Sequence, residues 1–255
     1  MRKTISAVLI THNEAENLPD CLASLQDWVD EIVVVDNHSS DDTVRIAQQH
    51  GAKVLQTPDW PGFGVQKNRA LDLATCDWVL SIDADERVTP ELMAEIQSIL
   101  ATEPMLKTYE IPRLSWYCGK FIRHAGWRPD FVLRLFERGS ARFSDDLVHE
   151  RVVPTGKVGQ LKHALLHYSY RNFSQVLHKV NAYSSASAQQ AFASGKRSSV
   201  AGALGHGAWA FFRTYVLRAG FLDGSHGLAL SISNAQTSYY KYLKLWQMAQ
   251  DLDKH

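Results

Sequence analysis

Four short runs with strand character in the first 82 residues constrain the fold of this chain more than any other feature. They are Ile5–Ile10, Ile32–Val35, Lys53–Gln56 and Trp78–Ile82. A helical pattern separates each run from the next; between the first two, for example, leucines recur at spacings of four and three residues. Strands that alternate with helices in this way predict an α/β fold with a mainly parallel sheet and right-handed crossovers.

Polar side chains gather where these runs end. Thr11, Asn13 and Glu14 follow the first run, Asp36 and Asn37 follow the second, and Asp83 and Asp85 follow the fourth. The carboxyl ends of parallel strands meet at one edge of a sheet, and ligands bind outside that edge, so we expect a binding site there. The competing interpretation for Asn13 is that it caps the helix that follows it.

The segment Asp83-Ala84-Asp85 is the sharpest of these signals. On an extended backbone, Asp83 and Asp85 point the same way, so both carboxylates can reach a single divalent cation. The alternative is a solvated acidic turn before the next helix. Glu86 is expected only to begin that turn.

Missing motifs and the cysteine spacing argue against several classes of protein. The turn after the first run has no glycine, and no G-x-x-x-x-G-K-[ST] motif occurs, which argues against dinucleotide-binding and P-loop enzymes. The three cysteines are far apart in the sequence and odd in number, so they fit neither a disulfide framework nor a zinc motif.

Charge is distributed unevenly along the 255 residues, although the formal net charge is zero. Residues 1–150 carry 15 Lys and Arg against 24 Asp and Glu, whereas residues 151–255 carry 12 against 3. A basic carboxyl-terminal segment suggests an anionic partner, either a nucleic acid or an anionic membrane surface. We expect no nucleic acid, because the basic residues lie among aromatic residues in helices and the predicted site is acidic.

Motifs along the chain together resemble family 2 glycosyltransferases with the GT-A fold. The matching segments are Ile10–Glu14, Val34–Thr43, Gly64–Asn68, Ile82–Glu86, Arg128–Asp130, Arg134–Phe136 and Val148–Glu150. The GT-A resemblance covers residues 1 to about 165. The whole chain is similar to bacterial lipopolysaccharide core glucosyltransferases that add a β-1,4-glucose to the first heptose.

The resemblance implies a site for the donor nucleotide. The segment from Thr11 through Asn13 to Glu14, together with Asp36, would hold the uridine of a UDP-sugar, with a carboxylate accepting from the uracil imide N–H. Lys67 and Asn68 would contact the diphosphate or the ribose. The alternative for Lys67 is an ordinary solvated residue of a helix.

The resemblance also implies a cofactor, Mg²⁺ or Mn²⁺. Asp85 would hold this cation where it bridges the two phosphates, and Asp83 would contact the ribose or the donor sugar. The cation would neutralise charge that develops on the departing UDP. The alternating segment Phe131–Phe136 predicts a strand, from which Arg134 would reach a phosphate.

An inverting transferase needs a carboxylate near the acceptor hydroxyl to take its proton. Glu150 is the first candidate for this base, and Asp146 is the second. Related folds carry the base at about this distance after the metal motif, although many have a Glu-Asp pair where this chain has His149-Glu150. His149 is either a further ligand of the metal or phosphate, or a structural histidine.

The carboxyl-terminal segment predicts helices, the first capped by Asn172, and a turn at Gly224 and Gly227 before the last. The run Val200–Phe212 has no Lys, Arg, Asp or Glu, but spanning a bilayer takes ~20 apolar residues. With aromatic and basic neighbours, this run suits a helix in a membrane interface. The alternative is a helix that packs on the protein with its charges solvated.

These observations predict a GT-A domain over residues 1–165, with a nucleotide-binding half (1–88) and an acceptor half (89–165), and a basic helical segment over 166–255. The expected activity is metal-dependent, inverting transfer of a hexose from a UDP-sugar to a heptose of a lipid-linked lipopolysaccharide core. We expect the enzyme at the cytoplasmic face of the inner membrane, bound to its anionic surface. The alternatives are a polyprenyl-phosphate sugar synthase and a non-catalytic module that binds nucleotide sugar.

Overall fold

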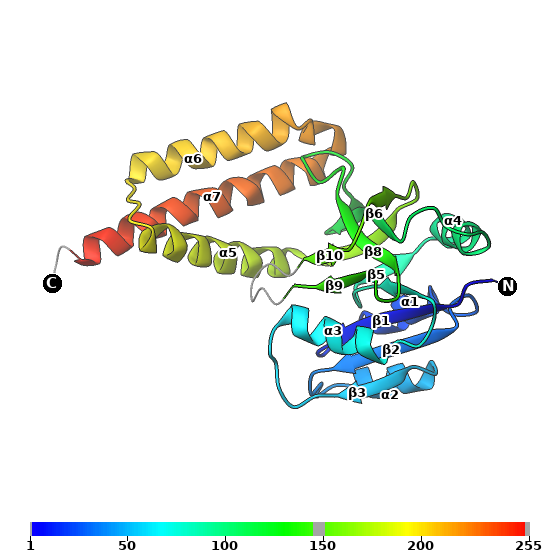
Figure 1. Ribbon diagram of the computed structural model, residues 1–255. Helices are drawn as coiled ribbons and strands as arrows, with labels where there is room; N and C mark the ends of the chain where they lie inside the picture. Colours follow the sequence, from blue (N-terminus) through cyan, green and yellow to red (C-terminus); the bar gives the residue numbers. More distant parts are fainter. Residues whose placement is uncertain (1, 145–150, 253–255) are drawn as a thin grey trace. The chain divides into compact units, whose positions relative to one another are not determined.

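The computed structural model describes residues 2–144 and 151–252, which fall into two compact units (Figure 1). The first unit comprises residues 1–113 and 130–167, and the second comprises residues 114–129 and 168–255. The segment 114–129 therefore belongs with the carboxyl-terminal helices rather than with the residues that flank it.

The first unit begins with the predicted alternation of strands and helices. Its elements in chain order are β1 (Ile5–Thr11), α1 (Leu18–Ala23), β2 (Glu31–Asp36), α2 (Thr43–Gln49), β3 (Lys53–Gln56), α3 (Phe63–Leu73), β4 (Trp78–Ser81), β5 (Glu86–Val88), α4 (Pro90–Leu100), β6 (Thr108–Tyr117), β8 (Phe131–Glu137), β9 (Ala141–Phe143), β10 (Val152–Pro154), β11 (Val158–Gln160) and β12 (Leu165–Tyr170). Strands β6 and β12 each have residues in both units.

Strand β1 lies in the middle of the parallel part of the sheet. It pairs in parallel with β2 and β4, and β2 pairs in parallel with β3. Strand β8 then adds antiparallel to β4, and β6 adds antiparallel to β8. The strand order is β3-β2-β1-β4-β8-β6-β12-β5. The predicted α/β class and its parallel sheet are confirmed.

Helices cover both faces of this sheet, and the side chains of β1 alternate between the two apolar clusters that result. Ala7 and Leu9 pack in a cluster that includes residues of α1, α2 and α4. Val8, between them, packs in a second cluster with Ala70 and Leu71 of α3. A parallel sheet that is buried on both sides leaves the carboxyl ends of its strands as its accessible polar edge.

Two expectations about helix starts had opposite outcomes. Asn172 caps the first carboxyl-terminal helix as predicted, since its side chain accepts from the Gln175 N–H at 3.0 Å. Asn13 does not cap α1, because the loop after β1 continues to Asn17 before that helix starts. Its side-chain oxygen accepts instead from the Ser40 N–H at 2.8 Å.

The second unit is built around α5 (Phe173–Ala193), α6 (Val200–Phe212) and α7 (Ser225–Leu252), with the short strand β7 (Lys120–Phe121). Helix α7 packs against both α5 and α6 (Figure 1). A π-helix, η1 (Arg213–Leu217), continues α6, and a 3₁₀-helix, η2 (Gly220–Asp223), leads into α7. None of the described helices is long and apolar enough to cross a membrane.

The predicted turn at Gly224 and Gly227 is right only for its first residue. Gly224 precedes α7, but Gly227 lies within its first turn. A Cβ atom at Gly227 would lie 1.8 Å from the carbonyl oxygen of Gly220. Glycine is needed there because η2 and α7 approach closely, and not because the chain turns.

Candidate active site

Strands β1 and β2 end side by side, and their last residues share hydrogen bonds. Thr11 and Asp36 are register partners, and the Thr11 hydroxyl donates to Asp36 Oδ1 at 2.9 Å. The Asp36 carboxylate also accepts from the N–H and the hydroxyl of Ser39, at 2.9 and 2.5 Å. Asp36 is fully buried. Its carboxylate therefore holds the loop after β2 in place.

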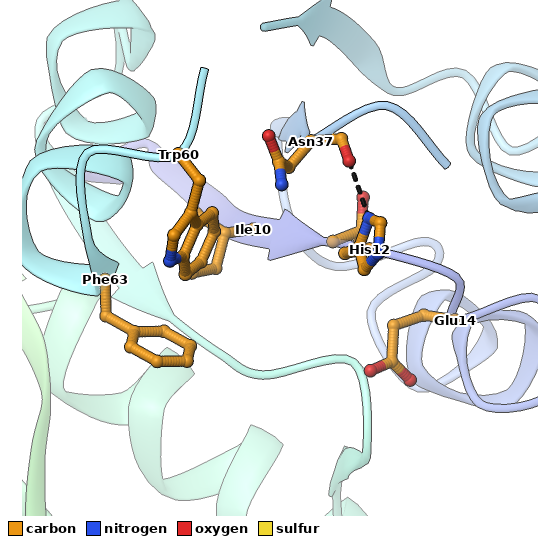
Figure 2. Close-up of a pocket in the computed structure, with 7 residues that line it drawn as sticks. Ile10, His12, Glu14, Asn37, Trp60 and Phe63 are labelled. Carbon is orange, nitrogen blue, oxygen red and sulfur yellow. Dashed lines mark hydrogen bonds between the residues drawn. The ribbon is translucent and has the colours of Figure 1, made fainter. Parts of the chain in front are cut away.

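A pocket of about 420 Å³ opens beside this loop (Figure 2). Its lining residues are Ile10, Thr11, His12, Glu14, Asn37, Trp60 and Phe63. Trp60 and Phe63 lie opposite His12 and Glu14 across the pocket (Figure 2). The two rings pack edge to face with centroids 4.8 Å apart, yet they are 44% and 47% exposed. An open aromatic wall that faces polar groups suits a flat, polar ring such as a nucleobase.

The polar side of the pocket is fixed by local hydrogen bonds. His12 Nδ1 lies 2.6 Å from the carbonyl oxygen of Asn37. The Glu14 carboxylate accepts from the side-chain amide of Asn17 at 2.7 Å, and the Glu14 N–H donates to Thr43 at 2.8 Å. These contacts orient the two side chains before any ligand arrives.

Five charged side chains form a cluster where β4 ends. Arg134 on β8 donates to Asp83, and to Glu86 Oε1 at 2.9 Å. Lys67 Nζ on α3 lies 3.1 Å from Asp83 Oδ1. The Asp83 N–H donates to Glu86 Oε2 at 2.9 Å. Arg113 Nη1 also lies 3.5 Å from Glu86 Oε1, so three cations surround the two carboxylates, as burial of charge requires.

This cluster corrects two expectations. Glu86, expected only to begin a turn, is the first residue of β5 and is fully buried, because it is a partner of Arg134. Lys67 is 8% exposed, so the alternative of a solvated helix residue is wrong. Helix α3 turns this side chain toward Asp83 and over the ring of Phe143, 5.3 Å from its centroid.

The charges of the cluster reinforce one another. Burial would raise the pKa of Asp83, but Arg134 and Lys67 outweigh it and hold this pKa well below its usual range. Burial raises the pKa of the Glu86 carboxyl. Burial would lower the pKa of Arg134, but Asp83 and Glu86 hold it above its usual value. Arg134 therefore stays charged and fixes the position of Asp83.

Asp85 faces a residue that the sequence analysis missed. His167 Nε2 lies 3.3 Å from Asp85 Oδ2, with the two side chains 19% and 31% exposed. Strand β12 pairs antiparallel with β5 and places His167 opposite Glu86, next to Asp85. Asp85 and His167 are thus a pair of donors that is open to solvent.

This pair fits part of a divalent-cation site. Within residues 2–144 and 151–252, no three His, Cys, Asp or Glu side chains are grouped as metal ligands. One carboxylate and one imidazole leave most of a coordination sphere to other donors. Cations that are shared with phosphates keep few protein ligands, so the donor set fits a cation that a diphosphate helps to bind.

Asn68 is engaged away from this cluster. Its amide donates to the carbonyl oxygen of Phe143 at 2.9 Å and accepts from the Phe143 N–H at 3.0 Å. Both ends of the amide therefore hold β9 against α3.

The candidate base Glu150, its alternative Asp146, and His149 lie outside the described residues, so their roles stay predictions. The described chain on either side of them is joined by hydrogen bonds. The Ser144 N–H donates to the Arg151 carbonyl oxygen at 2.8 Å, and the Arg151 N–H donates to the Ser144 hydroxyl at 3.0 Å.

Three residues of the site escaped the prediction: Trp60, Phe63 and His167. Asn37 was expected at this edge of the sheet, because it directly follows the end of β2, and it lines the pocket. Trp60 lies in the proline- and glycine-rich connection after β3, and Phe63 begins α3 directly after it. His167 had no local signal, because its position depends on the pairing of β12 with the distant β5.

Comparisons of sequence identify the family. Residues 6–122 match the model of glycosyl transferase family 2. An uncharacterized glycosyltransferase of Rickettsia typhi is 33% identical over 97% of this chain and 88% of its own length. The lipopolysaccharide core biosynthesis glycosyltransferase LpsC of Rhizobium meliloti is 32% identical over 76% of this chain and 73% of its own length.

Comparison of structures identifies the fold. The crystal structure of S. aureus TarS residues 1–349 matches with a TM-score of 0.51 and 18% identity, over 65% of this chain and 60% of that chain. The same fragment of TarS has been solved in complex with UDP-GlcNAc. At this identity the likeness concerns the fold alone, and it confirms the predicted GT-A architecture. The chain therefore belongs to glycosyl transferase family 2 and is a glycosyltransferase.

Proposed function

We propose that this glycosyltransferase moves a hexose, most simply glucose, from UDP to a heptose of the lipopolysaccharide inner core. The similarity to LpsC supports this acceptor class. One observation supports a UDP-sugar as the donor: an aromatic pocket and the Asp85–His167 pair lie at the same edge of one sheet.

The uracil would lie against the aromatic wall of Trp60 and Phe63, with its polar edge toward Thr11 and Asn37. The geometry supports a change in the predicted contacts. Asp36 is buried, and its carboxylate already accepts hydrogen bonds from Thr11 and Ser39, so it would act by holding the loop after β2 in place. The neighbouring amide of Asn37, which lines the pocket, would accept from the imide N–H.

Asp85 and His167 would hold the divalent cation together with the diphosphate oxygens. An imidazole ligand favours Mn²⁺ over Mg²⁺, which prefers oxygen donors. The bound cation would supply positive charge to the leaving UDP. Asp83, fixed by Lys67 and Arg134, would face the ribose or the donor sugar.

Inversion requires a carboxylate to take the proton of the acceptor hydroxyl as that hydroxyl attacks the anomeric carbon. Glu150 is the proposed base, and Asp146 is the alternative. Glu150→Gln should lower kcat roughly 100-fold or more, because general-base catalysis contributes about 10²–10⁴-fold, while UDP binding stays unchanged. Asp146→Asn is the matched control. A full-rate Glu150→Gln enzyme would move the base to Asp146 or elsewhere.

The assay that tests the proposal measures UDP release and the mass of the product. Purified enzyme is given UDP-glucose and Mn²⁺ with either heptosylated lipid A or polyprenyl phosphate. Transfer to heptosylated lipid A alone supports the proposal, whereas transfer to polyprenyl phosphate alone identifies a polyprenyl-phosphate sugar synthase. UDP-galactose in parallel tests the sugar, and digestion of the product with α- and β-glucosidases tests inversion.

The same proposal places the enzyme at the cytoplasmic face of the inner membrane, where the lipid-linked acceptor is exposed. Its support is the basic carboxyl-terminal segment, whose charge suits an anionic lipid surface.

A further inference from the structure

Helix α6 distributes its side chains in the opposite way to an ordinary amphipathic helix of a water-soluble protein. The stripe that faces inward consists of small residues, Ala203, Gly207, Ala210 and Thr214. The close approach to α7 explains this choice, since a Cβ at Gly207 would lie 3.1 Å from Tyr239 Cβ. The large apolar side chains are therefore left for the opposite face.

Large apolar side chains do fill that outward face and continue through the connection to α7. We call this surface the apolar tip, and its members are Trp209, Phe212, Val216, Leu217, Phe221 and Leu222, which are 44–60% exposed. Trp209, Phe212 and Val216 follow one another at spacings of three and four residues, so they lie on one side of the helix. A concentrated exposed apolar surface of this kind marks an interaction site.

The charges around the apolar tip are of one sign. Arg213 is exposed and lies one helical turn after Trp209, and Arg218 is exposed next to Leu217. Residues 168–250 contain eight Lys and Arg and a single acidic residue, Asp223.

Asp223 does not offset this charge at the surface. It is 2% exposed, and its carboxylate accepts from the backbone N–H groups of Arg123 and His124, at 3.2 and 2.8 Å. The surface around the apolar tip therefore offers basic groups and almost no side-chain carboxylate.

We propose that the apolar tip inserts into the interface of an anionic lipid bilayer, with Arg213 and Arg218 at the level of the lipid phosphates. This inference rests on the proposed function, in which the acceptor is embedded in a membrane. Exposed aromatic and aliphatic side chains beside basic residues are what interfacial helices use to bind anionic membranes.

A second copy of the same surface fits less well. A symmetric contact between two tips would set Arg213 and Arg218 against like charges, with no exposed carboxylate from residues 168–250 to pair with them. Lipid phosphates supply the missing negative charge.

The test is co-sedimentation of the full-length protein with vesicles of phosphatidylglycerol and phosphatidylcholine, and with vesicles of phosphatidylcholine alone. The variant Leu217→Ser/Leu222→Ser removes two of the most exposed apolar side chains of the tip, and Arg213→Gln removes one charge. Met105→Ser, at a 98% exposed position of the first unit, is the matched control. Unfolding temperatures of all variants are measured alongside.

The wild-type protein and Met105→Ser should bind the anionic vesicles and bind phosphatidylcholine much more weakly. The double serine variant should bind anionic vesicles at least about tenfold more weakly, and Arg213→Gln several-fold more weakly. Equal binding of wild type and the double variant overturns the proposal. So does a wild-type dimer, seen by light scattering, that the double variant loses.

Calorimetry of UDP binding separates this proposal from the proposed function. The double serine variant should bind UDP with unchanged affinity, because the tip lies outside the donor site. Loss of vesicle binding with intact UDP binding supports the tip as the membrane contact. Intact vesicle binding in a protein that binds no UDP-sugar would leave the tip in place and remove the proposed function.

Discussion

Asp36 and Asn37 are neighbours in the chain but have different environments. Asp36 is fully buried and its carboxylate accepts three hydrogen bonds from Thr11 and Ser39. Asn37 lines the pocket. The first side chain is therefore expected to govern stability and the second to govern binding.

Substitution of the two residues should separate these effects. Asn37→Ala should weaken UDP binding about tenfold with little change in the unfolding temperature, since one hydrogen bond to the base is lost. Asp36→Ala should lower the free energy of unfolding by about 1–3 kcal/mol, because it leaves buried donors of Thr11 and Ser39 without their acceptor. Titration calorimetry and thermal melts give both numbers. An Asn37→Ala protein with wild-type UDP affinity would return the uracil contact to Asp36.

Individual residues also show where sequence reasoning succeeds and fails. Asp83 and Asp85 were recognisable because both the strand and the charges are local in sequence. The burial of Glu86 could not be recognised from the sequence, because it depends on the ion pair with Arg134. Arg134 comes from β8, which pairs antiparallel with β4. The pairing of His167 with Asp85 likewise depends on a contact between strands that are far apart in the chain.

Strands β1 to β3 are tied together at their amino-terminal side by one carboxylate. Glu31 on β2 accepts from Ser6 on β1 at 2.5 Å, from Lys53 on β3, and from the N–H of Thr75 at 2.8 Å in the segment before β4. Burial alone would raise the pKa of Glu31, but these hydrogen bonds outweigh it and lower the pKa to about 2.

This carboxylate should make stability depend on pH. Because its pKa is lower in the folded state than in the unfolded chain, its contribution is complete above about pH 4.5 and is lost as the pH falls toward 2. Glu31→Gln should cost up to about 3 kcal/mol at pH 7, and the gap from wild type should close in acid. Urea unfolding of both proteins from pH 7 to pH 3 measures this difference in the free energy of unfolding. Glu103→Gln, at an 89% exposed side chain, is the control, and a gap that ignores pH would refute the role.

The junction of η2 with α7 should tolerate no side chain at Gly227. Gly227→Ala would place Cβ 1.8 Å from the Gly220 oxygen, so it should destabilise the second unit by about 3 kcal/mol or more. Gly205→Ala on α6 is the matched control, because nothing lies within 4 Å of its Cβ, and it should stabilise by up to about 1 kcal/mol. Thermal melts of both variants decide the matter, and equal melting temperatures would contradict the described packing.

Elements were predictable where periodicity is local. The parallel strands β1 to β4 and the capped helix α5 follow from apolar runs and cap residues. The antiparallel strands β8, β6 and β12 are harder, because their partners depend on how the chain returns to the sheet. The inverted pattern of α6 is visible as an uncharged run, but only its packing on α7 shows which side chains face outward.

The chain as a whole combines an acidic part, residues 1–150, that carries most of the candidate site with a basic part that carries His167 and the apolar tip. A parallel sheet concentrates polar groups from the ends of β1, β2 and β4 at one edge, which accounts for a site built from residues far apart in the sequence. The fold class and the family were accessible from the sequence because these strand ends carry motifs. The ligand set was accessible only in part, because His167 reaches the site through the second, antiparallel portion of the sheet.

Asp85 and His167 are proposed to bind UDP through a shared divalent cation. Titration calorimetry measures UDP binding with Mn²⁺ and with a chelator, in the wild type and in the variants Asp85→Asn and His167→Gln. The control is His163→Gln, which changes a histidine paired with Glu95 at the surface. Mn²⁺ should tighten UDP binding at least about tenfold in the wild type and in the control, and not in the other two variants. Metal-independent binding by the wild type, or tightening that survives in both site variants, would rule out Asp85 and His167 as ligands of the cation.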